Sequence, residues 1–277
     1  MTTPAGVAAH YGRRDLLGRL REAVMAAGLD WERLRAEDLG PLDHLHVRGR
    51  EATLDLARLA GVTAGHTVLD VGGGLGGPAR TLAATIGCQV TVLDLTPEFC
   101  EAGEELTRRT GLSDQVRFQV GDALTLPFPD RAFDLVWTEH SSMNIPDKPR
   151  LYAEIHRVIR PGGRLALHEI AGGPGGPVSF PVPWAARAEL SFLLPEAELR
   201  ARIREAGLHE RLWQELSGPS LAWAESRLGP AAPPAEGPRG LQAPPAPERA
   251  QALSNLRDGL AQQRLRVIAA VFEAGAD

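Results

Sequence analysis

The sequence has little cysteine and almost no lysine. Its 277 residues contain two cysteines, Cys88 and Cys100. Two cysteines make neither a disulfide framework nor the paired spacing of a zinc site. Of the 30 basic residues, 29 are arginine and one is Lys148. No Gly-Lys-Ser/Thr sequence is therefore present, and a Walker A phosphate loop is excluded.

The chain also lacks a long apolar run and an excess of positive charge. No run approaches the roughly 20 residues that cross a bilayer, and the N-terminus has no signal-type apolar stretch. The net charge of −5 and the pI near 5.9 give no electrostatic reason to expect nucleic acid. We therefore expect a cytoplasmic protein without membrane or nucleic-acid partners, and leave a homodimer open. The apolar share of 43% is ample for a core.

A glycine-rich turn follows a predicted buried strand. Residues 67–80 have the sequence TVLDVGGGLGGPAR. The apolar start predicts a strand of a parallel sheet, and Pro78 suits the first turn of a following helix. Glycine lets the backbone turn sharply and lets a ligand approach the main chain. A strand, a glycine turn and a helix N-terminus together predict a nucleotide-type site at the carboxyl end of a sheet.

Two carboxylates distinguish between the nucleotide ligands that could bind there. Residues 72–77 fit the G-x-G-x-x-G spacing of dinucleotide sites, which any glycine-rich run can satisfy. Asp70, just before the glycines, would repel a pyrophosphate but could hold a cationic amino-acid group. Asp94 ends the next predicted strand, where it could accept hydrogen bonds from ribose hydroxyls. Asp70 therefore argues against a nicotinamide oxidoreductase.

Four segments together resemble a known family. They are LDVGGGLGGPAR, VTVLDLT, VGDALTLPFPDRAFDLVW and HRVIRPGGRLALHE. The resemblance is to the class I S-adenosylmethionine-dependent methyltransferases, in the small-molecule branch with sarcosine/dimethylglycine, sterol and sugar-O methyltransferases. It covers roughly residues 62–216 in order. Many relatives have Cys or Ser where this chain has Gly73, and glycine can make the same turn.

The resemblance implies S-adenosyl-L-methionine as cofactor and a small-molecule methyl acceptor. It places Asp94 at the ribose, Leu95 on the adenine, and Asp122 and Ala123 at the adenine edge. Glu139 and His140, after the fourth strand, are placed at the methionine half and the acceptor. The residues expected to bind the cofactor lie at successive strand ends: Asp70, Gly72, Gly73, Gly74, Asp94, Leu95, Gly121, Asp122, Ala123 and Glu139.

Strands and helices alternate along the core, which predicts an α/β fold with right-handed crossovers. We expect a Rossmann-like, doubly wound sheet of seven strands, six parallel and one antiparallel. The predicted strands end or lie at residues 67–70, 89–94, 116–120, 133–138, 164–169, 212–216 and 264–272. The predicted helices of this part span residues 97–109, 148–159, 195–206 and 249–262. A helical continuation is the rival interpretation of residues 264–272.

Two segments outside the core are expected to give specificity. Residues 1–60 are predicted to form a helical N-terminal lid, with helices at 15–27 and 48–59, ahead of a methyltransferase domain at 61–277. His46 or Arg48 could then touch the ligand. His44 and His46 could also ligate a metal, but no third histidine stands nearby in sequence, and we expect no metal. Residues 218–263, Pro-rich and then helical, are expected as an insertion before the last strand.

The acceptor atom is not determined by the sequence. An amine acceptor needs only to be neutral, whereas a hydroxyl or a carbon acid benefits from a general base. The candidate bases are His140, His168 and Glu169. Certain sugar-O enzymes carry a histidine pair where this chain has Met143 and Asn144, which weakens that comparison. N- or O-methylation is expected, with C-methylation or ligand binding without catalysis as the alternatives.

Overall fold

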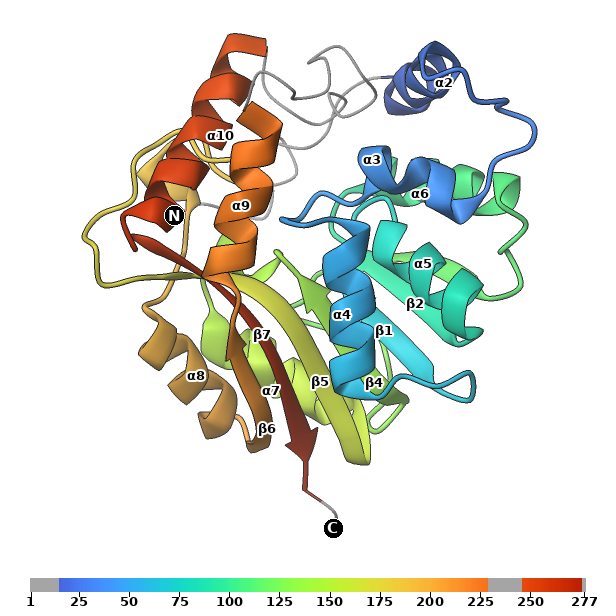
Figure 1. Ribbon diagram of the computed structural model, residues 1–277. Helices are drawn as coiled ribbons and strands as arrows, with labels where there is room; N and C mark the ends of the chain where they lie inside the picture. Colours follow the sequence, from blue (N-terminus) through green and yellow to red (C-terminus); the bar gives the residue numbers. More distant parts are fainter. Residues whose placement is uncertain (1–14, 229–245, 276–277) are drawn as a thin grey trace.

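Seven strands form one sheet at the centre of the structure (Figure 1). The computed structural model describes residues 15–228 and 246–275. The strand order is β3-β2-β1-β4-β5-β7-β6. The strands span Thr67–Val71 (β1), Gln89–Asp94 (β2), Val116–Val120 (β3), Phe133–Glu139 (β4), Ile159–Gly172 (β5), Leu208–Glu215 (β6) and Leu265–Ala274 (β7).

Strand β7 runs against both of its neighbours. It pairs antiparallel with β5 and with β6, whereas β1 to β5 pair in parallel. The predicted sheet of six parallel strands and one antiparallel strand is confirmed, and so is the strand interpretation of residues 264–272. The strand order reverses at β1, which has β2 on one side and β4 on the other. Ligands of such sheets bind at the carboxyl ends of the strands around this point.

Helices cover both faces of the sheet. Their bounds are Leu16–Ala26 (α2), Gly40–Asp43 (α3), Arg50–Ala60 (α4), Gly77–Ile86 (α5), Pro97–Arg109 (α6), Lys148–Val158 (α7), Glu196–Glu205 (α8), Ser217–Leu228 (α9) and Ala246–Ala261 (α10). Short 3-10 turns lie at Ala36–Leu39, Ser142–Asn144 and Ala188–Leu190. The predicted helices therefore exist, with ends that differ by a few residues.

Alternation along the strands separates two layers of core. Successive side chains of a strand point to opposite faces of the sheet. In β4, Leu135 and Trp137 pack in the core layer that also contains Leu56 of α4 and Leu256 of α10. Val136, between them, packs in the opposite layer, which contains Leu151 of α7. Glu139 therefore points to the same face as Trp137, toward α4.

Strand β5 begins earlier than residue 164, where the sequence predicted its start. Helix α7 ends at Val158, and Ile159 already pairs with Phe133 of β4. The register then shifts, because Leu135 pairs with Arg164. The segment 161–163 (Pro-Gly-Gly) is the irregularity, and a bulge of this kind accommodates a proline inside a sheet. The Pro-Gly-Gly sequence, which lies between the predicted helix at 148–159 and the predicted strand at 164–169, is therefore a bulge within β5.

The chain between β6 and β7 is partly described. Strand β6 begins at Leu208, before the predicted start at residue 212, because Leu208 pairs with Ala274 of β7. Helix α9 was not predicted; its Gly218 and Pro219 fall in the first turn, where proline is tolerated. Helices α9 and α10 pack against each other (Figure 1). Most of the Pro-rich segment, residues 229–245, lies outside the described residues.

The segment before β1 is joined to the core by a small apolar cluster and a buried ion pair. Leu20 of α2 and Leu39 pack against Phe99 and Leu106 of α6. The Arg80 guanidinium, fully buried on α5, donates to the Asp43 carboxylate at 2.8 Å. Within residues 15–228 and 246–275, every helix is too short or too polar to span a bilayer.

Candidate active site

The glycine loop is pinned across the carboxyl ends of β1 and β2. The backbone N–H groups of Gly72 and Gly73 donate to the Leu93 carbonyl at 2.8 and 3.3 Å. The Gly74 N–H donates to Asp94 Oδ2 at 2.9 Å. Gly72 and Gly74 have φ values of 74° and 55°, in the left-handed region that favours glycine. Residues that carry a side chain would therefore be strained in the backbone conformation of this loop.

Asp94 and Asp70 differ in how their oxygens are satisfied. Asp94 accepts from the N–H of Gly74 and, through Oδ1, from that of Thr96 at 2.9 Å. Asp70 lies beneath Gly73, and its Oδ2 has no hydrogen-bond partner among the described residues. Burial, with a contribution from Asp94, raises the pKa of Asp70 to about 8. A cation that entered beside Asp70 would meet a carboxyl group with free bonding capacity.

The third predicted acid lies next to these two. The Gly121 N–H donates to the backbone carbonyl of Asp94 at 2.9 Å, which holds the end of β3 beside that of β2. Asp122 accepts from the Leu124 N–H at 2.9 Å, and its side chain is half-buried. Leu95 and Ala123 are also half-buried. The structure thus brings the ends of β1, β2 and β3 together, with surface left for a ligand over Leu95 and Ala123.

A second group of polar side chains is buried at the ends of β4 and β5. Glu139 and His168 are paired in register across the two strands. His46, from the segment between α3 and α4, lies beside them, with Nε2 at 3.5 Å from Glu139 Oε2. Ligating atoms of His46, Glu139 and His168 all lie within 4.8 Å of one another. His140 is the third histidine of this group. Its ring stacks on that of His168, with the two ring centroids 4.9 Å apart.

Burial decides the protonation of these groups. It lowers the pKa of His168 to about 3, with a smaller contribution from Arg48. Burial also holds the pKa values of His46 and His140 well below their ordinary range. The same burial raises the pKa of Glu139 to about 8, against hydrogen bonds that favour its charged form. The imidazoles are neutral near pH 7, and each presents a lone pair.

Glu139 is held in place by two donors that the sequence did not point to. Trp137 Nε1 donates to its Oε2 at 3.0 Å, and Thr53 Oγ1 of α4 donates to the same atom at 2.9 Å. The contact of Trp137 could have been found from the sequence, because Trp137 and Glu139 are two residues apart in β4 and so lie on the same face of the sheet. Thr53 could not, because it comes from a helix that packs over the sheet. Arg48 bonds to Glu51 and Asp55 rather than to this group.

Glu169, a predicted candidate base, points to the other face of the sheet. Its carboxylate accepts from the Ser142 hydroxyl at 2.8 Å and from the Ser141 and Ser142 N–H groups at 3.3 Å. Lys148 holds the same loop, since its ammonium donates to the carbonyls of Ser142 and Phe192 at 2.7 and 2.9 Å. Glu169 therefore positions the loop after β4, next to His140.

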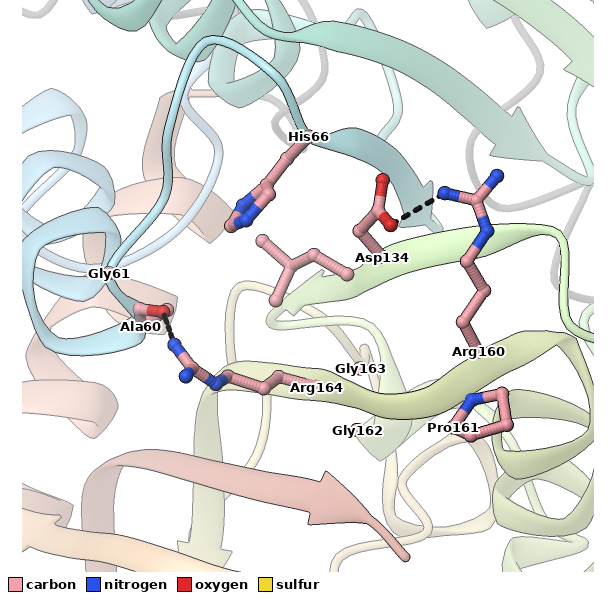
Figure 2. A pocket seen from close by; sticks show the side chains of 10 residues that line it. Ala60, Gly61, His66, Asp134, Arg160, Pro161, Gly162, Gly163 and Arg164 are labelled. Atoms are coloured by element: carbon pink, nitrogen blue, oxygen red, sulfur yellow. Dashed lines mark hydrogen bonds and ion pairs between the residues drawn. The ribbon is translucent and has the colours of Figure 1, made fainter. Parts of the chain in front are cut away.

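A surface hollow lies at the opposite end of the sheet (Figure 2). Its polar groups are already paired: Arg160 bonds to Asp134 at 2.5 Å, and Arg164 donates to the Ala60 carbonyl at 2.8 Å. Asp134 lies at the start of β4, far along the strand from Glu139 at its end. None of the predicted site residues lines this hollow.

Comparison with known proteins identifies the part of the chain that carries this site. A family model described as a methyltransferase domain matches residues 69–167. The chain contains a methyltransferase domain. Methyltransferase GfsG of Streptomyces halstedii is 39% identical over 133 residues, which cover 48% of this chain and 48% of that protein. The chain thus aligns with about half the length of this curated relative.

Two solved structures extend the likeness of fold. One is a geranyl diphosphate methyltransferase in complex with SAM, with a TM-score of 0.65 and 21% identity. That match covers 81% of this chain and 84% of the other. The other is the [4+2]-cyclase SpnF, with a TM-score of 0.71 and 23% identity over 99% of this chain and 98% of that one. Both matches show that this chain shares the fold of these proteins.

Proposed function

We propose that the chain is an S-adenosyl-L-methionine-dependent methyltransferase that moves a methyl group to nitrogen or oxygen of a small molecule. One observation carries the proposal. The family match over residues 69–167 spans the loop in which Gly74 is bonded to Asp94. This loop and the free oxygen of Asp70 lie at the strand ends where such folds bind nucleosides.

Each part of the cofactor has a group suited to it. Asp94 accepts from the ribose hydroxyls, Leu95 packs on the adenine, and Asp122 accepts from the adenine amino group. Ala123 offers a backbone N–H to the ring, and the cationic amino group of the methionine half lies toward Asp70. These assignments extend the family pattern to residues that the structure gathers at adjoining strand ends.

The reaction asks the protein mainly to align two reactants. A lone pair of the acceptor attacks the methyl carbon in line with the sulfonium, and the carbon–sulfur bond breaks with its electron pair remaining on sulfur. S-adenosylhomocysteine leaves, and a protonated acceptor loses its proton to a base. Holding the acceptor behind the methyl and excluding water supplies most of the acceleration.

His140 is the best-placed base of the three candidates. Its Nε2 is buried and has no hydrogen-bond partner among the described residues, and the residue directly follows β4. Glu169 is engaged by Ser141 and Ser142. His168 is the other candidate imidazole, and its ring stacks directly on that of His140.

The helices before β1 form the cover of this site in our proposal, as the predicted lid over residues 1–60. His46 reaches Glu139 from this segment, and Leu45, half exposed, lies over Gly74. Asp43 is fixed to Arg80 beneath them. We assign acceptor specificity to this cover and to the chain between β6 and β7, residues 218–263, since loops on a common scaffold carry variable chemistry.

A labelled-methyl assay tests the function. The protein is incubated with S-adenosyl-L-methionine that carries tritium in the methyl group, together with a fractionated extract of small metabolites. We expect label in one or a few fractions, and its position then gives the acceptor atom. Absence of transfer from a protein that binds S-adenosylhomocysteine would favour the alternative of ligand binding without methyl transfer. Binding of S-adenosylhomocysteine is measured as a control for this alternative, because SpnF, named as a cyclase, shares the fold over 99% of this chain.

A further inference from the structure

Three side chains from separate parts of the chain present ligating atoms to one point. His46 comes from the segment before α4, Glu139 from the end of β4, and His168 from β5. We call them the His46–Glu139–His168 cluster. All three are buried, with exposed fractions of 5%, 8% and 1%. Their ligating atoms lie within 4.8 Å of one another, although nothing in the sequence places them together.

His46 has a polar neighbour at each ring nitrogen. Its Nδ1 faces the Val47 carbonyl at 3.3 Å, and a carbonyl can only accept, so the proton lies on Nδ1 when this bond is made. In that tautomer His46 Nε2 presents a lone pair, at 3.5 Å from Glu139 Oε2 and at 3.3 Å from the Thr53 hydroxyl. That hydroxyl donates to Glu139 Oε2 at 2.9 Å.

Further bonding capacity at the cluster is unused. Glu139 Oε1 and both ring nitrogens of His168 are buried and have no hydrogen-bond partner among the described residues. Buried polar atoms are paired in the great majority of cases, so each unpaired one calls for an explanation. A cation with several coordination positions would satisfy lone pairs from all three side chains at once.

The spacing suits a metal ion. For tetrahedral coordination with bonds of about 2.1 Å, two ligating atoms lie about 3.4 Å apart. The 3.5 Å between His46 Nε2 and Glu139 Oε2 matches this separation. Two imidazoles and one carboxylate form a donor set of catalytic zinc and of non-haem iron sites, in which further positions stay open.

We propose that His46, Glu139 and His168 bind one divalent transition-metal ion of the zinc or iron(II) class. The groups around them are those expected to orient metal ligands: the Val47 carbonyl fixes the His46 ring, and Trp137 Nε1 and Thr53 Oγ1 fix Glu139. The one cation nearby, among the residues described, is Arg48, whose charge is offset by Glu51 and Asp55.

His140 lies beside this cluster, with its ring centroid 4.9 Å from that of His168. If the proposed methyl transfer is correct, on which this step rests, an acceptor hydroxyl bound to the ion would lose its proton more readily and would attack the methyl group as an alkoxide. Metal binding itself is independent of the methyl transfer and is tested separately.

The test is a titration of the tag-free, full-length protein with Co²⁺ after treatment with EDTA and dialysis. Co²⁺ reports its own coordination through visible absorption bands. We expect one Co²⁺ per chain, with the absorption of a four- or five-coordinate ion, displaced by Zn²⁺. The same titration is made on His168→Ala and on Glu139→Gln, and on His209→Ala as a matched control, since His209 is exposed on β6.

His168→Ala and Glu139→Gln should each weaken Co²⁺ binding by about 100-fold or more, while His209→Ala should leave it unchanged. Far-UV circular dichroism shows whether each variant folds. His168→Asn is used in place of a variant that does not fold. Absence of stoichiometric Co²⁺ on the wild-type protein, or equal affinity in all variants, would overturn the site. Binding of S-adenosylhomocysteine to the EDTA-treated protein is measured in parallel, so failure of the proposed function is seen separately.

Discussion

The Asp94 carboxylate holds the glycine loop and, in the proposed complex, the ribose. It accepts from the N–H groups of Gly74 and Thr96, and each oxygen keeps a lone pair for a hydroxyl. Asp94→Ala should weaken S-adenosylhomocysteine binding by about 1–3 kcal/mol, because charge-assisted hydrogen bonds are lost. Calorimetry measures the change, and Asp114→Ala, at an exposed acid, is the control. Unchanged affinity in a folded Asp94 variant would remove this residue from the site.

Asp70 makes the stability of the ligand-free protein depend on pH. Burial raises its pKa from 3.8 to about 8, so the folded state holds a proton that the unfolded state releases. This contribution is fully present below about pH 4 and is lost as the pH rises through 8. The side chain introduced by Asp70→Asn cannot titrate. Between about pH 4 and 8 the unfolding free energy of this variant should therefore fall less than that of the wild type, by about 1 kcal/mol or more.

Urea unfolding of Asp70→Asn and the wild type at several pH values between 4 and 8 measures this difference. Asp114→Asn serves as the control at an exposed position. Other buried acids, including Glu139, also have raised pKa values, so the comparison is between slopes rather than between single values. Parallel curves for the Asp70 variant and the wild type would contradict the buried neutral carboxyl.

The Asp43–Arg80 pair joins the segment before β1 to helix α5 of the core. Both side chains are almost fully buried, and burial of Asp43 is outweighed by His44 and Arg80, so its pKa is lowered. Asp43→Ala leaves a buried guanidinium without its counterion and should cost about 3–5 kcal/mol of unfolding free energy. Urea unfolding measures the cost. Glu37→Ala, in the exposed pair with Arg35, should cost far less, and a similar loss in both variants would refute the assignment.

At the scale of elements, the glycine loop depends on backbone conformation more than on space. A Cβ on Gly74 would meet Leu45 and Phe99 only at 3.7 and 3.9 Å, but the φ of 55° is unfavourable for a β-branched residue. Gly74→Val should therefore shift the loop and weaken S-adenosylhomocysteine binding at least as much as Asp94→Ala. Gly65→Val, where a side chain meets open space, is the control. Normal binding by the Gly74 variant would make the loop purely structural.

Local patterns predicted the elements well where one element ended before the next began. The predicted helix at 97–109 matched α6 at both ends, and the predicted strand at 89–94 matched β2 at both ends. The patterns failed where pairing with a distant strand decided the boundary. The bulge at residues 161–163 lies inside β5 because Ile159 pairs with Phe133. No local signal in the Pro-Gly-Gly sequence carries that information.

At the scale of the whole molecule, the gathering of Asp70, Asp94 and Asp122 was predictable and the His46–Glu139–His168 cluster was not. Asp70 and Asp94 end predicted strands and Asp122 follows one, and parallel strands end at one edge of a sheet. His46 lies in a connection between helices, and its approach to Glu139 and His168 depends on how α4 packs over β4 and β5. The sequence has no third histidine near His46, which wrongly suggested that His46 is isolated. In the structure, the ring centroids of His140 and His168 lie within 6 Å of that of His46.

The central claim is that the strand ends bind S-adenosyl-L-methionine. The most direct measurement is a pair of calorimetric titrations of the wild-type protein, one with S-adenosylhomocysteine and one with NAD. The account predicts saturable binding of S-adenosylhomocysteine, with a rise in melting temperature as ligand stabilises the folded state, and no binding of NAD. Binding of NAD without binding of S-adenosylhomocysteine would contradict it.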